Sequence, residues 1–237
     1  MRTSLLALAV LAAASAAAAE PGKVWKDSVE LSFVSANGNS KTQTASARDA
    51  FVWEVGPLKA ELEGGGLGAR SEGKTTAERY DAREKLAKKI DDRDYVFEQY
   101  RWDRDRFAGV AHRHDFQVGV GRELWKTEHD LLRGEASPGY VNEERFNDKR
   151  KSYASARLYA KYERAISATA KFSQDAEWVP SLADKRDSRL ATETALTAAL
   201  STSLSVKNSF VWKHDSRPPT GKRKDDTLLS VALIAGF

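Results

Sequence analysis

Residues 225–237, DDTLLSVALIAGF, form the C-terminal segment and point to the fold of the whole chain. Successive side chains of a β-strand point to opposite faces. One face of this segment carries Leu229, Val231 and Leu233 and ends on Phe237, while the other carries small or mixed residues. The chain as a whole is hydrophilic, with a mean hydropathy of −0.56 and 30% charged residues. An apolar strand face in such a chain must lie against a protein core or against the hydrocarbon of a membrane.

The same alternation of apolar and polar side chains recurs along the chain. It is clear in 28–33 (SVELSF), 166–173 (ISATAKFS) and 203–212 (SLSVKNSFVW). Turn-forming residues separate such segments. Together they predict twelve strands, at 25–36, 42–54, 58–69, 79–90, 94–104, 112–122, 130–140, 151–162, 165–177, 188–198, 201–213 and 226–237.

The assignment at 79–104 has an alternative. Residues 78–90, ERYDAREKLAKKI, also fit an amphipathic helix, and as a strand they place Glu84 and Lys88 on the apolar face. If 79–104 were helical, the number of strands would be ten.

The connections between the predicted strands are of two kinds. Short ones lie near 55–58, 91–94, 162–165 and 199–200, and long charged ones lie at 37–42, 70–78, 104–111, 142–151, 179–186 and 214–226. The two kinds alternate, except that 125–130 is intermediate. Transmembrane barrels have short periplasmic turns, longer external loops and, in bacteria, an even number of strands. The sequence therefore predicts an all-β fold: a monomeric, antiparallel, up-and-down transmembrane β-barrel of about 12 strands in the outer membrane.

Aromatic residues fit this fold. A tryptophan side chain prefers the headgroup level of a membrane, where its apolar ring and its polar N–H are both satisfied. With both termini in the periplasm, all six tryptophans fall at strand ends. We predict an aromatic girdle made of Trp25, Trp53 and Trp125 at the periplasmic ends, Trp102, Trp178 and Trp212 at the external ends, and Phe237 facing lipid in the inner girdle.

The N-terminal segment has the order of a secretory signal peptide. MRTSLLALAVLAAASAAAAE carries one positive charge, an apolar run and a tail of small residues. The apolar run is too short for the alternative, a membrane-anchoring helix. We expect a signal peptide at 1–19 and a barrel domain at 20–237.

Composition excludes several classes of protein. The chain has no cysteine, so an exported form has no disulfide framework. Its net charge of +4, or +3 once Arg2 leaves with the signal peptide, is small for so charged a protein and indicates no nucleic-acid partner. No later apolar run is long enough for a transmembrane helix.

Charged residues dominate the predicted inner face of the barrel. They are a selectivity lining for a small polar solute or ion, or they pair across a narrow barrel and plug it. The predicted lumen lining is Arg48, Glu61, Glu63, Arg83, Lys85, Glu98, Arg157, Lys161, Lys171, Glu193 and Lys207.

Two other features suggest chemistry. His112 and His114 alternate at a predicted strand start, where they could bind a metal or assist a serine in acyl transfer. The chain has no G-x-S-x-G motif, so a solvated pair at the barrel rim is favoured. Basic stretches at 147–151 and 221–224 could bind lipopolysaccharide phosphates or be ordinary solvated loops. We expect no catalytic residues, metal or other cofactor.

Two stretches resemble a known family. VELSFVSANGNSKTQTASA (29–47) and KRKDDTLLSVALIAGF (222–237) are similar to the first and last hairpins of the YdiY-like family of outer-membrane proteins described as salt-induced, a family of unknown function. The resemblance implies an outer-membrane barrel and a link to salt or osmotic response, and brings no catalytic residue and no substrate. The terminal aromatic strand also resembles the signal read by the barrel assembly machinery.

These observations predict a narrow pore or an envelope-integrity element. Two other classes stay open. One is an outer-membrane lipid-modifying hydrolase. The other is a soluble periplasmic β-sandwich binding protein, in which the apolar strand faces would pack inward.

Overall fold

The computed structural model describes residues 24–36 and 41–237, so the predicted signal peptide at 1–19 lies outside the described residues. Each strand pairs antiparallel with the next, and β12 pairs with β1 to close the barrel. The strands are β1 (Trp25–Ala36), β2 (Thr42–Val55), β3 (Leu58–Ser71), β4 (Lys74–Lys89), β5 (Asp94–Asp105), β6 (Val110–Lys126), β7 (Asp130–Arg145), β8 (Lys151–Ala165), β9 (Ala170–Pro180), β10 (Ser188–Ala199), β11 (Leu204–Asp215) and β12 (Asp225–Gly236). The predicted twelve-stranded antiparallel barrel is confirmed.

The segment 79–104, which could also have been helical, lies in β4 and β5 and in the turn that joins them. β4 pairs with β3 and with β5 along its length, so the helical alternative and the count of ten strands are wrong. The strand β9 begins later than the predicted residue 165. Ile166 and Ser167 both donate their backbone N–H to the carbonyl of Ala170, which makes 166–169 a turn.

The connections lie at the two ends of the barrel. The start of β1 and Phe237 mark one end, called here the near end, together with the turns 56–57, 90–93, 127–129, 166–169 and 200–203. The turns 72–73, 106–109 and 146–150 and the loops 181–187 and 216–224 lie at the opposite, far end.

One predicted long loop is a tight turn. Residues 70–78 were expected to form a charged loop, but β3 and β4 continue to Ser71 and from Lys74. Glu72 and Gly73 alone connect them, with φ of 49° and 77°. Positive φ at both central residues is typical of the two-residue hairpin turns that match the twist of the strands. The charged residues around this turn therefore extend the strands.

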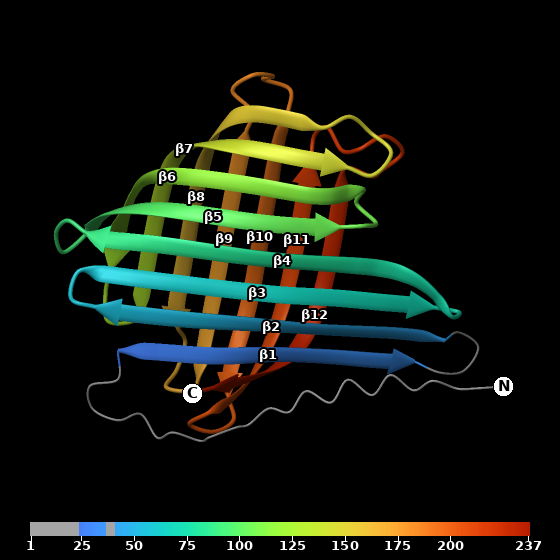
Figure 1. Cartoon of the computed structure of the whole chain (residues 1–237). Coiled ribbons are helices and arrows are strands. Elements are labelled where there is room, and N and C mark those ends of the chain that lie inside the picture. Colours follow the sequence, from blue (N-terminus) through green and yellow to red (C-terminus); the bar gives the residue numbers. More distant parts are fainter. Residues whose placement is uncertain (1–23, 37–40) are drawn as a thin grey trace.

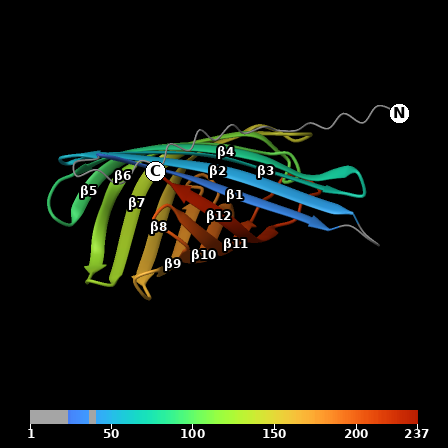
Figure 2. The same ribbon diagram turned by 90° about the horizontal axis from the view of Figure 1, so that it is seen from below.

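The wall closes on itself through a short seam. Figure 1 shows the first strands crossing in front of the last ones, and Figure 2 shows β1–β4 on one side of the barrel with β8–β12 facing them. β1 pairs with β2 from Trp25↔Trp53 to Ala36↔Thr42. Its ladder with β12 runs only from Ser28↔Gly236 to Leu31↔Leu233.

Large apolar side chains of β11 and β12 lie on the outer face of the wall. On the outer face Leu229, Val231 and Phe210 are 78%, 56% and 45% exposed. The inner-facing Ser209 and Ala232 of the same two strands are 5% and 4% exposed. The soluble sandwich requires these apolar side chains to pack inward, and they do not. Among the described residues no helix is long and apolar enough to cross a membrane.

Candidate functional site

The inner face carries most of the predicted lumen lining. Ten of the predicted residues lie there and take part in ion pairs with other inner-facing side chains: Arg48, Glu61, Glu63, Arg83, Lys85, Arg157, Lys161, Lys171, Glu193 and Lys207.

Glu98 is the exception, because it lies on the outer face. Its partners across the ladder are Leu86 and Val118, which are both exposed. Phe97 and its second neighbour Gln99 are the buried, inward-facing residues of this part of β5. The ring of Phe97 lies 4.5 Å from Lys85 Nζ, so an aromatic side chain holds the inner position that was assigned to a carboxylate.

One carboxylate inside the barrel, that of Glu135 on β7, accepts hydrogen bonds or ion pairs from side chains of three other strands. Lys85 on β4 forms an ion pair with Glu135 on β7, three strands away. Tyr95 Oη on β5 donates to Glu135 Oε1 at 2.7 Å, and Arg157 Nη1 on β8 donates to Glu135 Oε2 at 2.8 Å. All three charged side chains are nearly excluded from solvent. A buried charge is tolerated only when it is paired and hydrogen-bonded, and this arrangement meets that condition.

Arg157 extends this arrangement to a second crossing. Its Nε donates to Glu177 Oε2 on β9 at 2.5 Å. Arg101 on β5 donates to both oxygens of Glu177, at 2.6 and 3.1 Å. Such bidentate pairs fix geometry as well as charge. The chain Lys85–Glu135–Arg157–Glu177–Arg101, called here the lumen cluster, therefore joins β4 and β5 to β7, β8 and β9 across the interior.

A third crossing lies beside the lumen cluster. Arg189 Nη2 on β10 donates to Asp115 Oδ2 on β6 at 2.8 Å. Gln117 Nε2 donates to the other oxygen of Asp115 at 2.6 Å and to Ser155 Oγ at 3.2 Å. Gln117 and Ser155 are fully buried. Polar side chains from β6, β8 and β10 thus meet inside the barrel.

Other pairs stay on one side of the wall. Lys207 on β11 pairs with Glu193 on the adjacent β10 at 2.7 Å. Arg48 on β2 pairs with Asp81 on β4 at 2.8 Å, over the intervening strand. These pairs neutralise charges along the wall and do not cross the lumen. The side chains that cross and narrow the lumen therefore come from β4–β10.

A small cavity lies between the lumen cluster and the far end. It measures about 140 Å³, and its lining includes Arg101, Arg113, Arg189, Asp103 and Asp215. Arg113 donates to Glu143 at 2.6 Å and lies 3.8 Å from Asp215. The cavity therefore has a mixed charged lining, which is suited to a small polar solute or ion.

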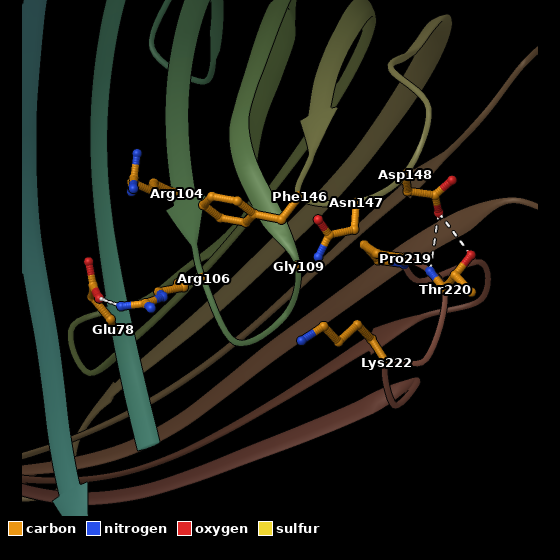
Figure 3. Close-up of a pocket in the computed structure, with 10 residues that line it drawn as sticks. All are labelled: Glu78, Arg104, Arg106, Gly109, Phe146, Asn147, Asp148, Pro219, Thr220 and Lys222. Atoms are coloured by element: carbon orange, nitrogen blue, oxygen red, sulfur yellow. Dashed lines mark hydrogen bonds and ion pairs between the residues drawn. The ribbon is translucent and has the colours of Figure 1, made fainter. Parts of the chain in front are cut away.

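The loop 216–224 is fastened to the turn 146–150. The backbone N–H and the hydroxyl of Thr220 both donate to Asp148 Oδ2 at 3.1 Å (Figure 3). Arg145 Nη2 also donates to the carbonyl of Arg217 at 3.1 Å. The backbone N–H groups of Lys149 and Thr220 lower the pKa of Asp148, so its carboxylate stays ionised at neutral pH. The loop is thus held by contacts that persist under physiological conditions.

The two histidines lie on the outer face of β6. Trp102 Nε1 donates to His112 Nδ1 at 3.2 Å, and Tyr100 Oη is hydrogen-bonded to His114 Nδ1 at 2.7 Å. These nitrogens are therefore engaged by aromatic neighbours and not by a serine hydroxyl. Within residues 24–36 and 41–237, no three potential ligands are grouped as a metal site. The arrangement supports an interfacial aromatic belt better than a catalytic pair.

The predicted girdle residues lie near strand ends. Each tryptophan is at most three residues from the end of its strand. Trp25 stacks on Phe51 with ring centroids 6.1 Å apart, and Trp125 and Trp178 are strongly exposed. Phe237 exchanges backbone hydrogen bonds with Asp27, at 2.8 and 3.3 Å. Their placement at the headgroup level of a membrane stays a prediction.

Sequence reasoning missed five members of the inner network: Arg101, Asp115, Glu135, Glu177 and Arg189. The alternation carried a signal for them, because Asp115 and Gln117 alternate with His114 and Phe116 on β6. Which side chain lies across the lumen from which depends on strand order and stagger, and those are properties of the closed barrel.

Comparisons with known proteins give matches both in sequence and in fold. The family described as "Protein of unknown function, DUF481" matches residues 29–237. The uncharacterized protein YdiY of Escherichia coli (strain K12) is 25% identical over 202 residues, covering 83% of this chain and 77% of that protein.

Several solved structures, which include an outer membrane channel and a porin, have a similar fold. An outer membrane channel from Pseudomonas putida F1 gives a TM-score of 0.57 at 9% identity, over 92% of this chain and 99% of its own. The NanC porin gives 0.53 at 11% identity, over 89% and 97%. The translocator domain of the autotransporter NalP from Neisseria meningitidis gives 0.52 at 10% identity, over 92% and 90%. At these identities the likeness establishes the fold alone.

Proposed function

The chain belongs to the DUF481 family of proteins of unknown function, and from its barrel we propose that it is a narrow outer-membrane pore for small polar solutes or ions. The family match and the similarity to YdiY confirm the resemblance drawn from residues 29–47 and 222–237.

This proposal rests mainly on the charged residues of the lumen cluster. Buried ion pairs cost desolvation energy that apolar packing would avoid. A barrel needed only as a structural element could fill its interior with apolar side chains, but this interior is lined with charges of both signs. Charged linings tune the selectivity of channels. The pairs Lys85–Glu135 and Arg101–Glu177 would form the constriction that limits conduction.

An outer-membrane location is part of the proposal. The outward apolar residues of β11 and β12 and the tryptophans near strand ends fit a barrel embedded in lipid. The near end would then lie in the periplasm and the far end outside the cell. Membrane fractionation followed by gel electrophoresis with and without heating tests this location, since a folded barrel migrates differently from the unfolded chain. Recovery in the soluble periplasmic fraction would contradict it.

Conductance across a planar bilayer tests the pore. The purified protein is expected to give small, infrequent channel events. The variant Lys85→Ala/Glu135→Ala removes one cross-lumen pair without changing net charge, and it is expected to give larger or more frequent events. The matched control Lys207→Ala/Glu193→Ala removes a pair that stays on the wall, and it should conduct like the unmodified protein.

The occluded interior also favours a second candidate, an envelope-integrity element that does not conduct. Absence of channel events from both the unmodified protein and Lys85→Ala/Glu135→Ala, at every voltage, would rule out the pore and leave this candidate. Heat-dependent gel mobility shows that the unmodified protein and the variant are both folded. An absence of channel events then reports a closed lumen and not an unfolded barrel.

A role in the salt or osmotic response is the finer part of the proposal. It rests on the family resemblance and on the ion pairs of the interior. Salt weakens those ion pairs that water can reach. A strain lacking the gene should grow more slowly than its parent at high salt and equally well at low salt. Equal growth under both conditions would remove the salt link and leave the pore untouched.

We also propose that the protein is not an enzyme. The engagement of His112 and His114 by Trp102 and Tyr100 supports this view against a lipid-modifying hydrolase. A His112→Ala/His114→Ala variant and the unmodified protein should be equally inactive on phospholipid and lipopolysaccharide substrates. Hydrolysis that the double variant loses would show that this view is wrong.

A further inference from the structure

A pocket of about 480 Å³ lies at the far end of the barrel, apart from the lumen cluster (Figure 3). It is formed where the end of β5 and the turn 106–109 meet the turn 146–150 and the loop 216–224. The lining residues that bear on its chemistry are Glu78, Arg104, Arg106, Phe146, Asn147 and Lys222.

The position of Arg104 relates this pocket to the membrane. Arg104 follows Trp102 by two residues on the outer face of β5, and its ladder partner is the exposed Tyr80. Two residues of a strand advance the chain by about 7 Å. If Trp102 lies at the headgroup level, Arg104 lies slightly farther out, at the level of lipid phosphates.

Two cations of the pocket are available to a ligand. Arg106 is already paired with Glu78 at 3.0 Å. The carboxylate of Asp148 accepts hydrogen bonds from Thr220 and Lys149. In the part of the chain that the structure describes, neither Arg104 nor Lys222 has a carboxylate partner. The pocket therefore presents positive charge that the protein does not neutralise.

The geometry of these groups favours a phosphate. The guanidinium carbon of Arg104 lies 5.5 Å from the centre of the Phe146 ring, which limits its freedom. Figure 3 shows the Lys222 ammonium and the Asn147 amide directed toward the space between the turns. Asn147 has a φ of 62°, a left-handed conformation that Asn adopts more readily than most residues. Phosphate oxygens accept hydrogen bonds from guanidinium, ammonium and amide N–H groups.

We propose that this pocket binds a phosphate group of an outer-leaflet glycolipid, the phosphorylated sugar headgroup of lipopolysaccharide. Lys222 contacts the phosphate and Asn147 donates a further hydrogen bond. Arg104 lies on the other side of the Phe146 ring, where it contacts a second anionic group of the headgroup, and the ring packs against the sugar. Bound lipid bridges β5, the turn 146–150 and the loop 216–224, and thereby adds to the contacts that already hold the loop. The proposal rests on the outer-membrane location but does not require that the lumen conduct.

Native mass spectrometry of the purified full chain in detergent micelles tests it. The probes are lipid A with two phosphates, the same lipid with both phosphates removed, and inorganic phosphate as a competitor. The chain should bind the phosphorylated lipid, and the variant Arg104→Gln/Lys222→Gln should weaken this binding about tenfold or more because two charge-assisted contacts are lost. The lipid without phosphates should bind the unmodified chain as weakly as the phosphorylated lipid binds the variant.

A matched control separates a site from general attraction between charges. Lys41→Gln/Lys185→Gln removes the same charge from two other exposed residues at the far end, and it should leave binding unchanged. Equal binding by Arg104→Gln/Lys222→Gln and the unmodified chain would overturn the proposal, as would equal losses in both double variants. Displacement of the lipid by inorganic phosphate at comparable concentration would show a free-phosphate site instead. The binding measurement does not depend on conductance. It therefore tests the phosphate site even if the protein proves not to conduct.

Discussion

Arg189 on β10 and Asp115 on β6 are hydrogen-bonded across the lumen at 2.8 Å, four strands apart, and both side chains are largely buried. Removing one partner of such a pair leaves an uncompensated charge in a poorly solvated place. Each of Asp115→Leu and Arg189→Leu should therefore lower the free energy of unfolding by about 3–5 kcal/mol. Urea unfolding in lipid vesicles, followed by tryptophan fluorescence, measures the change.

The double variant distinguishes pairing from packing. Asp115→Leu/Arg189→Leu removes both charges and should recover much of the stability that either single variant loses. Additive losses in the double variant would show that the two side chains stabilise the barrel independently.

The strands β6 and β7 approach each other closely at Gly119, which leaves no room for a larger side chain. A Cβ at Gly119 would lie 2.4 Å from the carbonyl oxygen of Ala136 and 2.8 Å from the Cα of Ser137. These are backbone atoms, which cannot yield as a flexible side chain can. Gly119→Ala should lower the unfolding free energy by about 1–3 kcal/mol or more, as overpacking does in cores. The midpoint temperature of the heat-dependent gel shift measures the effect.

Gly68 on β3 is the matched control. A Cβ there meets no atom of the described residues within 4 Å, and its φ is not in the left-handed region. Gly68→Ala should leave the midpoint unchanged or raise it slightly, because alanine loses less conformational freedom on folding. If Gly119→Ala behaved in the same way, β6 and β7 would have room that the structure does not show.

The sequence predicted the strands well because alternation is a local property. The bounds of β1 were predicted to the residue, since turn residues flank a clear pattern there. The turn at Glu72–Gly73 was predicted as a long loop because charged residues dominate both flanks, and composition cannot distinguish a polar loop from polar strand ends. The structure places the charged flanks on strands that extend beyond the predicted bounds.

The interior was less predictable because it depends on long-range contacts. Glu98 was assigned to the lumen on charge, yet Phe97 takes the inner position beside Lys85. The partner of Lys85 is Glu135, fifty residues away in sequence. No local pattern identifies that partner, because it follows from strand order and stagger.

The orientation of the outer face toward lipid can be measured on β12. Val231 lies near the middle of this strand and is exposed on the outer face. A lysine at the bilayer midplane costs about 2–4 kcal/mol, and one near the interface costs about 0–1 kcal/mol. Val231→Lys should thus destabilise the barrel in lipid vesicles far more than Thr227→Lys, which lies on the same face near the far end. Similar small effects of both substitutions would show that this face does not contact hydrocarbon.

The short seam between β1 and β12 makes the last residue important for closure. Phe237 and Asp27 exchange two backbone hydrogen bonds just beyond a ladder that contains only the pairs from Ser28↔Gly236 to Leu31↔Leu233.

Deleting Phe237 removes both bonds, each worth about 0.5–1.5 kcal/mol. Phe237→Ala keeps the backbone groups and loses only the ring. The deletion should therefore lower the unfolding midpoint of the refolded barrel more than Phe237→Ala does. Equal midpoints for the deletion and the unmodified protein would show that the seam closes without these bonds.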